Sequence, residues 1–420
     1  MNKTKIIAGI ELGSSKISTL VAQIASDQVT FENSINIVGA ASSVSKGIKK
    51  GQIVNIEEAT DATISSVEAA ERMAGYNLDK AYISIGGAHI NSQNSHGVVA
   101  VSDPNGEISQ DDVSRVIDAA SAISLPQSRE IIHILPRDYV VDGEAGAKDP
   151  LGMSGIRLEV DTHIVTASSA VVKNIRKVID EVGIEIEGLV YSGLAASEAV
   201  LSETEKELGC VLIDVGGGTT SIAVFVEGSL SYSSVIPIGA KNVTNDLAIG
   251  LRVSLESSEK IKIMLSDVGK SKKDDSDEVD LSVLDLPDVK KISKKTLVEG
   301  IIKPRLNEIF SIVRLELERE GLSGRIPSGA IITGGGAETA GCLESAKRTL
   351  SLPIRIGKPQ GVGGLIDDIM TPAYATGTGL IIYGAHSLSN EPLTSFTKKL
   401  KLPTKGIAGK IVNIIKDLLP

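Results

Sequence analysis

The sequence is poor in aromatic side chains. Only 3% of its 420 residues are Phe, Trp or Tyr, and Trp is absent. Surfaces that bind single-stranded nucleic acid rely on such rings for base stacking. A phosphate backbone also requires a basic surface, whereas this chain carries a net charge of −10. We therefore expect no nucleic-acid partner.

Cysteine and histidine are scarce as well. The two cysteines, Cys210 and Cys342, lie in apolar stretches and form no CxxC pair, and the five histidines are scattered. This composition gives no metal-binding pattern. It predicts two reduced thiols in the core of a protein kept in a reducing compartment.

Long apolar runs are missing. No segment approaches the roughly 20 apolar residues that a spanning helix needs, and the N-terminal run before Glu11 is too short for a signal peptide. We expect a cytoplasmic protein whose membrane contact, if any, is peripheral. Because 420 residues exceed one hydrophobic core, we also expect at least two lobes.

One pattern occurs twice, about 200 residues apart. In Gly9–Lys16 (GIELGSSK) and in Leu212–Thr219 (LIDVGGGT), apolar residues of a predicted strand are followed by an acidic residue, an apolar residue, a Gly and then small residues. Both segments continue into a further apolar strand. Two matched copies predict two α/β lobes that are built alike.

A hairpin turn of Gly, Ser and Thr can direct several backbone N–H groups at one anion, and small side chains let phosphate approach closely. The acidic residues at the two strand ends, Glu11 and Asp214, can hold Mg²⁺ through water. Either turn alone is equally consistent with a plain hairpin, but two opposed turns can hold one phosphate chain. The predicted phosphate contacts are Gly13, Ser14, Ser15, Lys16, Gly216, Gly217, Gly218 and Thr219.

Two further elements could hold the rest of a nucleotide. The strand Ala330–Thr333 ends in Gly334, Gly335 and Gly336 and leads into a helix-like segment from Glu338 to Leu350. Such a turn lets a base lie against the backbone or places a helix N-terminus near phosphate, although tight strand–helix crossovers are common. Glu259 and Lys262 share one face of a probable helix and could bond ribose and adenine, or form an ordinary exposed ion pair.

The order and spacing of these four elements resemble the ATPase fold shared by actin, Hsp70 and the sugar kinases. From Ile6 to about Tyr383 the chain resembles the FtsA family of actin-like bacterial division proteins. The segments of closest resemblance are Leu151–Arg157, Ser192–Ala195, Glu207–Thr220 and Lys303–Glu308, with Ala375–Leu380 resembling the second connecting helix. The implied fold class is α/β, an actin-like ATPase with a duplicated core, an inserted 1C subdomain and a C-terminal amphipathic helix.

The resemblance divides the chain into consecutive parts. The expected divisions are 1–83 for the first part of the lobe 1 core (1A), 84–166 for the inserted 1C subdomain, 167–193 for the rest of 1A, 194–384 for lobe 2 (2A, with a 2B insertion at about 243–310 and a last helix that returns to lobe 1), 385–403 for a flexible linker and 404–420 for the amphipathic helix. The charge-dense segment 270–295 is expected to be a solvated excursion.

Hydrolytic members of the superfamily carry Gln or Glu on the first connecting helix to orient the attacking water. The matching stretch here, Tyr191–Ala196, has neither, and Glu198 lies a turn further along. Without a positioned water, catalysis loses both orientation and proton transfer. We expect ATP and Mg²⁺ to bind tightly and hydrolysis to be slow, and no catalytic residue is predicted.

Residues 405–420 form a strongly amphipathic pattern whose apolar residues fall within an arc of roughly 160°. From Lys398 to the end there are six lysines against one acidic residue. Such a helix is suited to the interface of an anionic bilayer, although it could also pack on the protein body or in a partner's groove. The predicted membrane contacts are Ile407, Lys410, Ile411, Ile414, Ile415, Lys416 and Leu418.

The resemblance implies a peripheral protein on the cytoplasmic face of the membrane at the division septum. It would polymerise head to tail, bind the C-terminal tail of the tubulin-like protein FtsZ, and recruit later division proteins through 1C. Arg305 and Glu308 match the family's positions for the FtsZ tail. The alternatives are a small-molecule kinase, for which no catalytic Asp is apparent, and a PilM-like pilus platform, whose family lacks the C-terminal helix.

Overall fold

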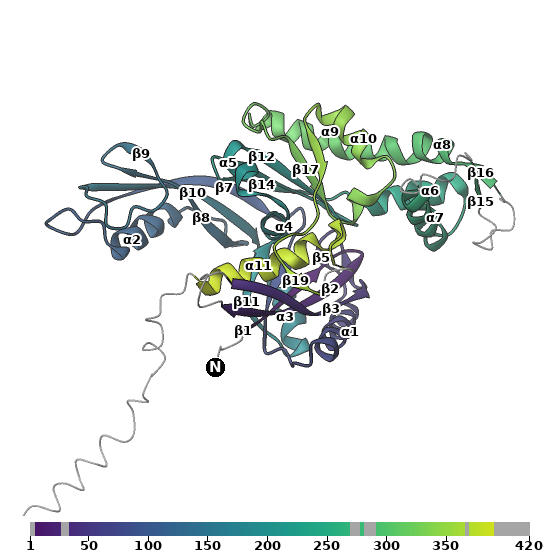
Figure 1. The fold of residues 1–420 in the computed structure, drawn as a ribbon, viewed down its shortest axis with the longest axis horizontal. Helices are drawn as coiled ribbons and strands as arrows, with labels where there is room; N and C mark the ends of the chain where they lie inside the picture. The colour runs from purple at the N-terminus through teal and green to yellow at the C-terminus, as the bar shows by residue number, and fades with distance from the viewer. Residues whose placement is uncertain (1–4, 27–32, 269–277, 281–290, 366–368, 390–420) are drawn as a thin grey trace, which may run out of the picture.

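The computed structural model describes residues 5–26, 33–268, 278–280, 291–365 and 369–389 of the chain. It contains two lobes, each built on a mixed β-sheet, and an insertion that extends from lobe 1 (Figure 1). In the view of Figure 1, lobe 1 lies below, lobe 2 lies above, and the insertion projects to the left.

Lobe 1 is built on a six-stranded sheet in the order β11-β6-β1-β2-β3-β19. Its strands are β1 (Lys5–Leu12), β2 (Lys16–Ser26), β3 (Asn33–Val44), β6 (Lys80–Ile85), β11 (Glu185–Tyr191) and β19 (Gly363–Gly364), with a small ribbon of β4 (Ile48–Lys49) and β5 (Gln52–Ile53) nearby. The helices are α1 (Ile56–Ala74), α3 (Ser169–Val182), α4 (Ser192–Val200) and α11 (Ala375–Ser389). Side chains alternate across β1, so Ala8 shares a buried cluster with Val67 of α1, whereas Ile7 packs with Ile381 of α11.

Lobe 2 repeats this topology. Its sheet has the order β14-β13-β12-β17-β18, and its strands are β12 (Cys210–Val215), β13 (Thr220–Val226), β14 (Ser229–Ile236), β17 (Ala330–Thr333) and β18 (Ile354–Ile356). In both lobes the first strand is antiparallel to the second and parallel to a later strand, as for β1 with β2 and β6, and β12 with β13 and β17. The shared order confirms that the two lobes are built alike.

The lobes differ in what is placed between equivalent strands. Between β6 and α3, lobe 1 carries the insertion (residues 91–168): a sheet in the order β7-β10-β8-β9 with one covering helix. Its elements are β7 (Asn91–Ala100), α2 (Gln110–Ser121), β8 (Arg129–Val141), β9 (Glu144–Ala147) and β10 (Arg157–Ser168), and Val116 and Leu158 lie in its own core.

Lobe 2 carries its extra elements between β14 and β17. These are α6 (Ala240–Leu251), α7 (Leu255–Val268), β15 (Glu278–Asp280), β16 (Lys291–Ser293), α8 (Lys294–Leu297), the π-helical turn Val298–Ile302 and α9 (Lys303–Arg319). The remaining elements are α5 (Glu203–Leu208), α10 (Cys342–Leu350) and the 3₁₀ turns Gly335–Glu338 and Pro372–Tyr374.

Local features of the sequence account for several details of the fold. Asn55 caps α1, because its side chain accepts the N–H of Glu58 at 3.3 Å. Cys210 and Cys342 are free and buried, and burial raises the pKa of each thiol to about 12. No helix in the described part of the chain is both long and apolar enough to cross a bilayer.

Two boundaries differ from the prediction. The helix expected from Glu338 begins only at Cys342, because the glycine run closes into a 3₁₀ turn first. The helix α11 continues to Ser389, so the first residues of the expected linker are helical. Most of 270–295, the rest of the linker and the amphipathic helix 404–420 lie outside the described residues.

The connecting helices α4 and α11 are in backbone contact. A Cβ atom placed on Gly379 of α11 would lie 1.7 Å from the carbonyl oxygen of Ala195 on α4, closer than any two such atoms can approach. The two helices join the lobes, and this contact therefore depends on the absence of a side chain at Gly379.

Candidate functional site

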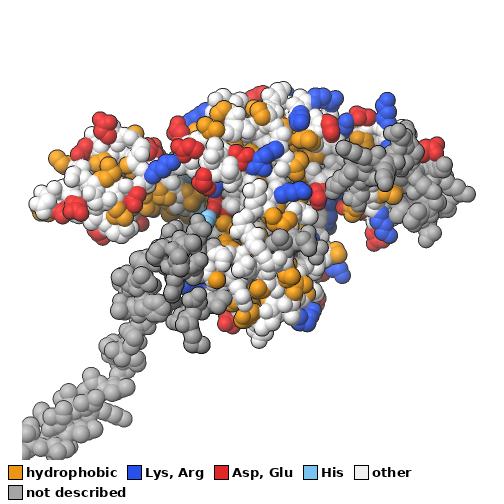
Figure 2. All heavy atoms as spheres, viewed as in Figure 1, with side chains coloured by type: hydrophobic (Ala, Val, Ile, Leu, Met, Phe, Trp, Pro, Cys, Tyr) orange, Lys and Arg blue, Asp and Glu red, His pale blue; other side chains and the backbone are white. Residues whose placement is uncertain are grey.

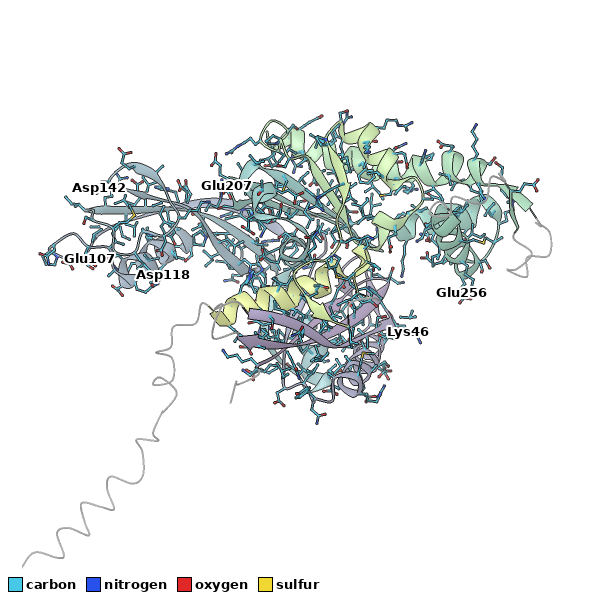
Figure 3. The ribbon with its side chains drawn as sticks, viewed as in Figure 1. Lys46, Glu107, Asp118, Asp142, Glu207 and Glu256 are labelled. Carbon is cyan, nitrogen blue, oxygen red and sulfur yellow. The ribbon has the colours of Figure 1, made fainter. Side chains whose placement is uncertain are left out.

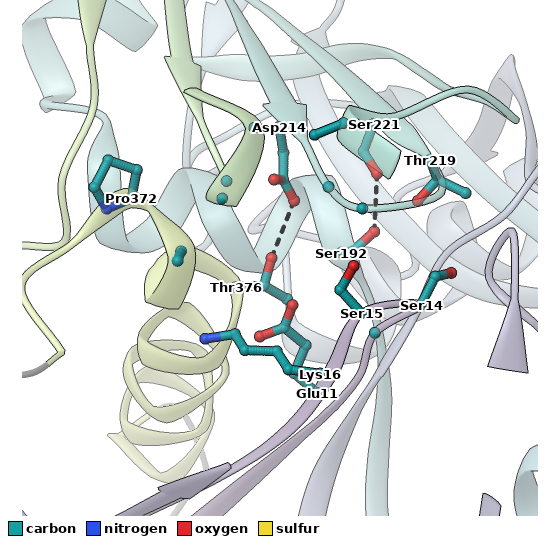
Figure 4. A pocket seen from close by; sticks show the side chains of 18 of the residues that line it. Glu11, Ser14, Ser15, Lys16, Ser192, Asp214, Thr219, Ser221, Pro372 and Thr376 are labelled. Carbon is teal, nitrogen blue, oxygen red and sulfur yellow. Dashed lines mark hydrogen bonds between the residues drawn. The ribbon is translucent and has the colours of Figure 1, made fainter. Parts of the chain in front are cut away.

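A cavity of about 290 Å³ lies between the lobes, where the β1–β2 and β12–β13 hairpins face each other (Figure 4). It is lined by twelve of the thirteen residues predicted to bind the nucleotide and by both predicted metal residues. The set comprises Glu11, Gly13, Ser14, Ser15, Lys16, Asp214, Gly216, Gly217, Thr219, Glu259, Lys262, Gly334, Gly335 and Gly336. Gly218 is not a lining residue, but it packs against Ser14 of the opposite turn.

The two turns are in close contact. A Cβ atom on Gly217 would lie 1.9 Å from the Oγ atom of Ser15, so only glycine allows this approach. The carbonyl oxygens of Gly216 and Gly217 accept the N–H groups of Ala240 and Lys241, at 2.9 and 2.8 Å. In a trans peptide the next N–H points opposite to the carbonyl. The N–H groups of Gly217 and Gly218 therefore point away from α6.

The first turn is held in the same way. The carbonyl oxygen of Ser14 accepts the Lys241 ammonium at 2.7 Å, and that of Ser15 accepts the N–H of Ser45 at 3.1 Å. With the carbonyls of both turns already bonded, their partial negative charges are neutralised, and the opposed N–H groups suit an anion held between the hairpins.

Two carboxylates face each other beneath these turns. Asp214 accepts a hydrogen bond from the Thr376 hydroxyl at 3.1 Å, and Glu11 accepts one from Ser18 at 2.9 Å. Burial, reinforced by the nearby Glu11, raises the pKa of Asp214 to about 7, and burial also raises the pKa of Glu11. A hydrated divalent cation would stabilise both ionised forms.

Within the described ranges, no three His, Cys, Asp or Glu side chains converge as a ligand set. The pair formed by Glu11 and Asp214 suits a Mg²⁺ ion held through its water shell, which this ion keeps strongly.

The ammonium of Lys16 is buried and lacks a hydrogen-bond acceptor among the described residues. It lies 3.1 Å from the ring centroid of Tyr374. Burial lowers its pKa, although Glu11, Glu338 and Asp214 favour the charged form. A buried cation without an acceptor is unfavourable, and a phosphate oxygen would supply the missing partner.

The glycine turn after β17 packs against the end of β12. Gly334 has a φ angle of +82°, and a Cβ atom there would lie 2.2 Å from the Asp214 carboxylate. A Cβ atom on Gly336 would lie 2.4 Å from the Val215 side chain. Only glycine fits at these two positions, and the turn lines one wall of the cavity.

The pair of Glu259 and Lys262 is more than an exposed ion pair. The ammonium of Lys262 is buried and contacts Glu259 at 2.8 Å and the Thr244 hydroxyl at 2.9 Å. Burial acts to raise the pKa of Glu259, but Lys262 and Thr244 outweigh it, and the pKa is lowered. This polar pair lines the end of the cavity on the α7 side.

The first connecting helix places a hydroxyl at the cavity. Ser192, at the start of α4, lies 3.1 Å from the hydroxyl of Ser221. Glu198 is instead held by Lys206 at 3.2 Å and His386 at 3.3 Å, and it is absent from the described lining residues. In this conformation α4 presents no carboxylate that could orient water.

Some lining residues were not predicted. Glu338, Thr376, Ser192 and Ser221 line the cavity, and Tyr374 stacks on Lys16. The segment containing Thr376 was noted only as a connecting helix. Its link to Asp214 spans 162 positions of sequence, which no local pattern reveals.

Comparison with known proteins gives a consistent result. A model of the SHS2 domain inserted in FTSA matches residues 87–166, and a model of cell division protein FtsA matches residues 211–379. The FtsA of Pseudomonas aeruginosa is 39% identical over 393 residues, which cover 92% of this chain and 91% of the relative. The FtsA of Escherichia coli is 33% identical over 398 residues, covering 92% of each.

Solved structures share the fold at low identity. A PilM–PilN type IV pilus biogenesis complex matches with a TM-score of 0.61 and 15% identity, covering 90% of this chain and 98% of the other. MreB5 of Spiroplasma citri bound to ADP matches with a TM-score of 0.52 and 14% identity, covering 92% and 99%. These likenesses establish an actin-like ATPase fold, and the curated relatives narrow it further: the chain belongs to the FtsA family of cell division proteins.

Proposed function

We propose that this protein binds ATP with Mg²⁺ between its lobes, polymerises on the cytoplasmic face of the membrane at the septum, and tethers the FtsZ ring there. The observation that carries the nucleotide part is the pair of facing hairpins, together with the acceptor-free ammonium of Lys16 in the lining of the same cavity. MreB5 of the same fold has been solved with ADP and with AMPPNP, which supports a nucleotide in this cavity.

Hydrolysis is proposed to be slow. Glu198 is engaged by Lys206 and His386, and Ser192 is the residue that α4 contributes to the cavity. ATP would then act mainly as a ligand that holds the two hairpins together. Head-to-tail assembly and recruitment of later division proteins through the insertion are part of the same proposal.

Membrane attachment is assigned to residues 404–420. We expect the full chain to sediment with vesicles containing phosphatidylglycerol and a chain lacking 404–420 to remain in the supernatant. The double variant Lys410→Glu and Lys416→Glu should bind about 30-fold more weakly or worse, because each of the two lysines contributes roughly 1 kcal/mol near an anionic surface.

The control is Lys46→Glu, an exposed charge reversal on the body of the protein (Figure 3), which should leave sedimentation unchanged. Equal sedimentation of the full and truncated chains would overturn the assignment of the helix. Equal binding to neutral and anionic vesicles would show that the lysines play no part.

The FtsZ tail is assigned to the start of α9. Arg305 there forms a forked pair with Asp246 of α6, at 2.6 and 2.9 Å, and also contacts Glu308. Arg305 is only 25% exposed, whereas Glu308 is 49% exposed. Glu308 is therefore the cleaner position to test, because changing Arg305 also removes the partner of Asp246.

The test is fluorescence anisotropy of a labelled peptide from the FtsZ C-terminal tail, titrated with protein lacking 404–420. We expect micromolar binding that weakens about tenfold in Glu308→Lys, the size of effect given by one reversed interface charge. Glu318→Lys, at the far end of α9 and 52% exposed, is the matched control and should bind normally. Absence of binding by the folded, ATP-loaded protein would remove the tether function.

A further inference from the structure

A second cavity, of about 510 Å³, lies where the insertion meets lobe 2. Its walls come from β7, β8 and β10 of the insertion and from β14, the end of α9 and the segment after α9 in lobe 2. β7 and β14 are edge strands of their own sheets. They are joined through side chains, since Ser92 donates to the Ser233 carbonyl at 2.8 Å and accepts its N–H at 3.1 Å.

Three arginines line this cavity: Arg137, Arg319 and Arg325. Glu320 is the single acidic residue among the described lining residues, and it is paired with Arg319 at 3.0 Å. Arg325 has an acidic neighbour only at 3.9 Å, in Glu227. The lining residues thus include three arginines against one glutamate, with Glu316 behind them accepting hydrogen bonds from the lining residues Tyr232 and Ser234.

Arg137 is the most unusual of the three. Its Nε atom is buried and has no hydrogen-bond partner among the described residues. The insertion to which it belongs is otherwise acidic, with twelve Asp or Glu against five Lys or Arg between residues 91 and 168. Glu107, Asp118 and Asp142 mark its outer part (Figure 3), and acidic side chains are prominent on its visible face (Figure 2). An anion in the cavity would supply the acceptor that the Nε–H group of Arg137 lacks.

The other walls are polar and neutral. His163 bonds Asn94 at 2.7 Å and Ser233 at 3.0 Å. Burial, with Arg137 nearby, lowers the pKa of His163 to about 3, so the ring stays uncharged at neutral pH. The positive charge of the cavity therefore comes from the arginines alone, while serine and asparagine side chains supply further hydrogen bonds.

Guanidinium groups bind phosphate through paired hydrogen bonds, and a buried N–H group without an acceptor is costly. We propose that this cavity binds a small molecule carrying two or more phosphate groups, held by Arg137 together with Arg319 and Arg325. The cavity is larger than the one between the hairpins and its polar walls do not suit an apolar ligand. Because its walls belong to both the insertion and lobe 2, the ligand would fix the insertion against lobe 2.

The probe is pyrophosphate, titrated by calorimetry into the full chain after saturation with AMPPNP, which keeps the probe out of the nucleotide cavity. We expect one saturable site whose affinity falls at least tenfold in Arg137→Gln and in Arg325→Gln. Arg157→Gln, a change on β10 of the same insertion at a 58% exposed side chain, is the matched control and should bind normally. Amide hydrogen exchange should slow in β7 and β14 when pyrophosphate is bound.

Unfolding midpoints of the variants establish that each is folded, and Arg325, which is 49% exposed, serves if the Arg137 variant is not. No binding by the folded wild-type chain would overturn the proposal. Unchanged affinity for pyrophosphate in both arginine variants would also overturn it. Equal displacement of pyrophosphate by sulfate and by citrate at matched ionic strength would overturn it as well, because it would indicate a general counter-ion effect.

Discussion

Gly379→Ala is expected to destabilise the protein by about 3 kcal/mol or more, the upper range for overpacking a buried contact. The added methyl group would lie 1.7 Å from the Ala195 carbonyl oxygen, and this neighbour is backbone that cannot rotate away. The clash is relieved only if α4 and α11 move apart, and this movement would also break the hydrogen bond from Thr376 to Asp214. Urea unfolding followed by circular dichroism measures the loss.

The matched control is Gly377→Ala, two positions earlier on α11. There the new Cβ atom would lie 3.1 Å from the end of the Leu20 side chain, which can shift. Alanine also favours the helix by about 1 kcal/mol over glycine, so this variant should be nearly neutral. Equal stability of the two variants would contradict the tight contact between the connecting helices.

Lys16→Met is expected to weaken ATP binding about 100-fold, or ~3 kcal/mol, the upper range for a hydrogen bond to a charged group. Methionine keeps the length of the side chain but removes the ammonium that lies between Tyr374 and the two carboxylates. Without nucleotide, this variant should be about as stable as the wild type, because the cost of a buried ammonium without an acceptor is lost together with its attraction to Glu11, Asp214 and the Tyr374 ring.

Binding of a fluorescent ATP analogue gives the affinity, and thermal unfolding without nucleotide gives the stability. Lys46→Met, at an exposed position outside the cavity, is the control and should change neither. An affinity for Lys16→Met within twofold of the wild type would refute the assignment of Lys16 to the phosphates. A large drop in stability without nucleotide would instead assign Lys16 a structural role.

Much of this site could be predicted from the sequence because its chemistry is local. An acidic residue at a strand end, followed by a turn of Gly, Ser or Thr, places its groups within one hairpin, and Gly13–Lys16 and Gly216–Thr219 needed no tertiary knowledge. The duplication of the fold was visible for the same reason, since each lobe begins with such a hairpin.

What the sequence did not reveal depends on distant contacts. Thr376 reaches the cavity, and Tyr374 reaches Lys16, only because the chain returns to lobe 1 at α11 and the turn before it, after the whole of lobe 2. The burial of Lys262 requires Thr244 on a neighbouring helix, so spacing alone left it indistinguishable from a surface pair. The engagement of Glu198 by His386 likewise joins two helices far apart in sequence.

The boundary between β7 and β14 also bears on how such a domain can change over evolution. Where two strands pair through backbone hydrogen bonds, their register fixes all the residue pairs together, and a single substitution cannot change that register. Here the two edges meet through Ser92, Asn94 and Ser233, whose contacts can be altered one residue at a time. A lineage could therefore remodel or exchange the insertion by point mutation while each flanking sheet kept its own pairing.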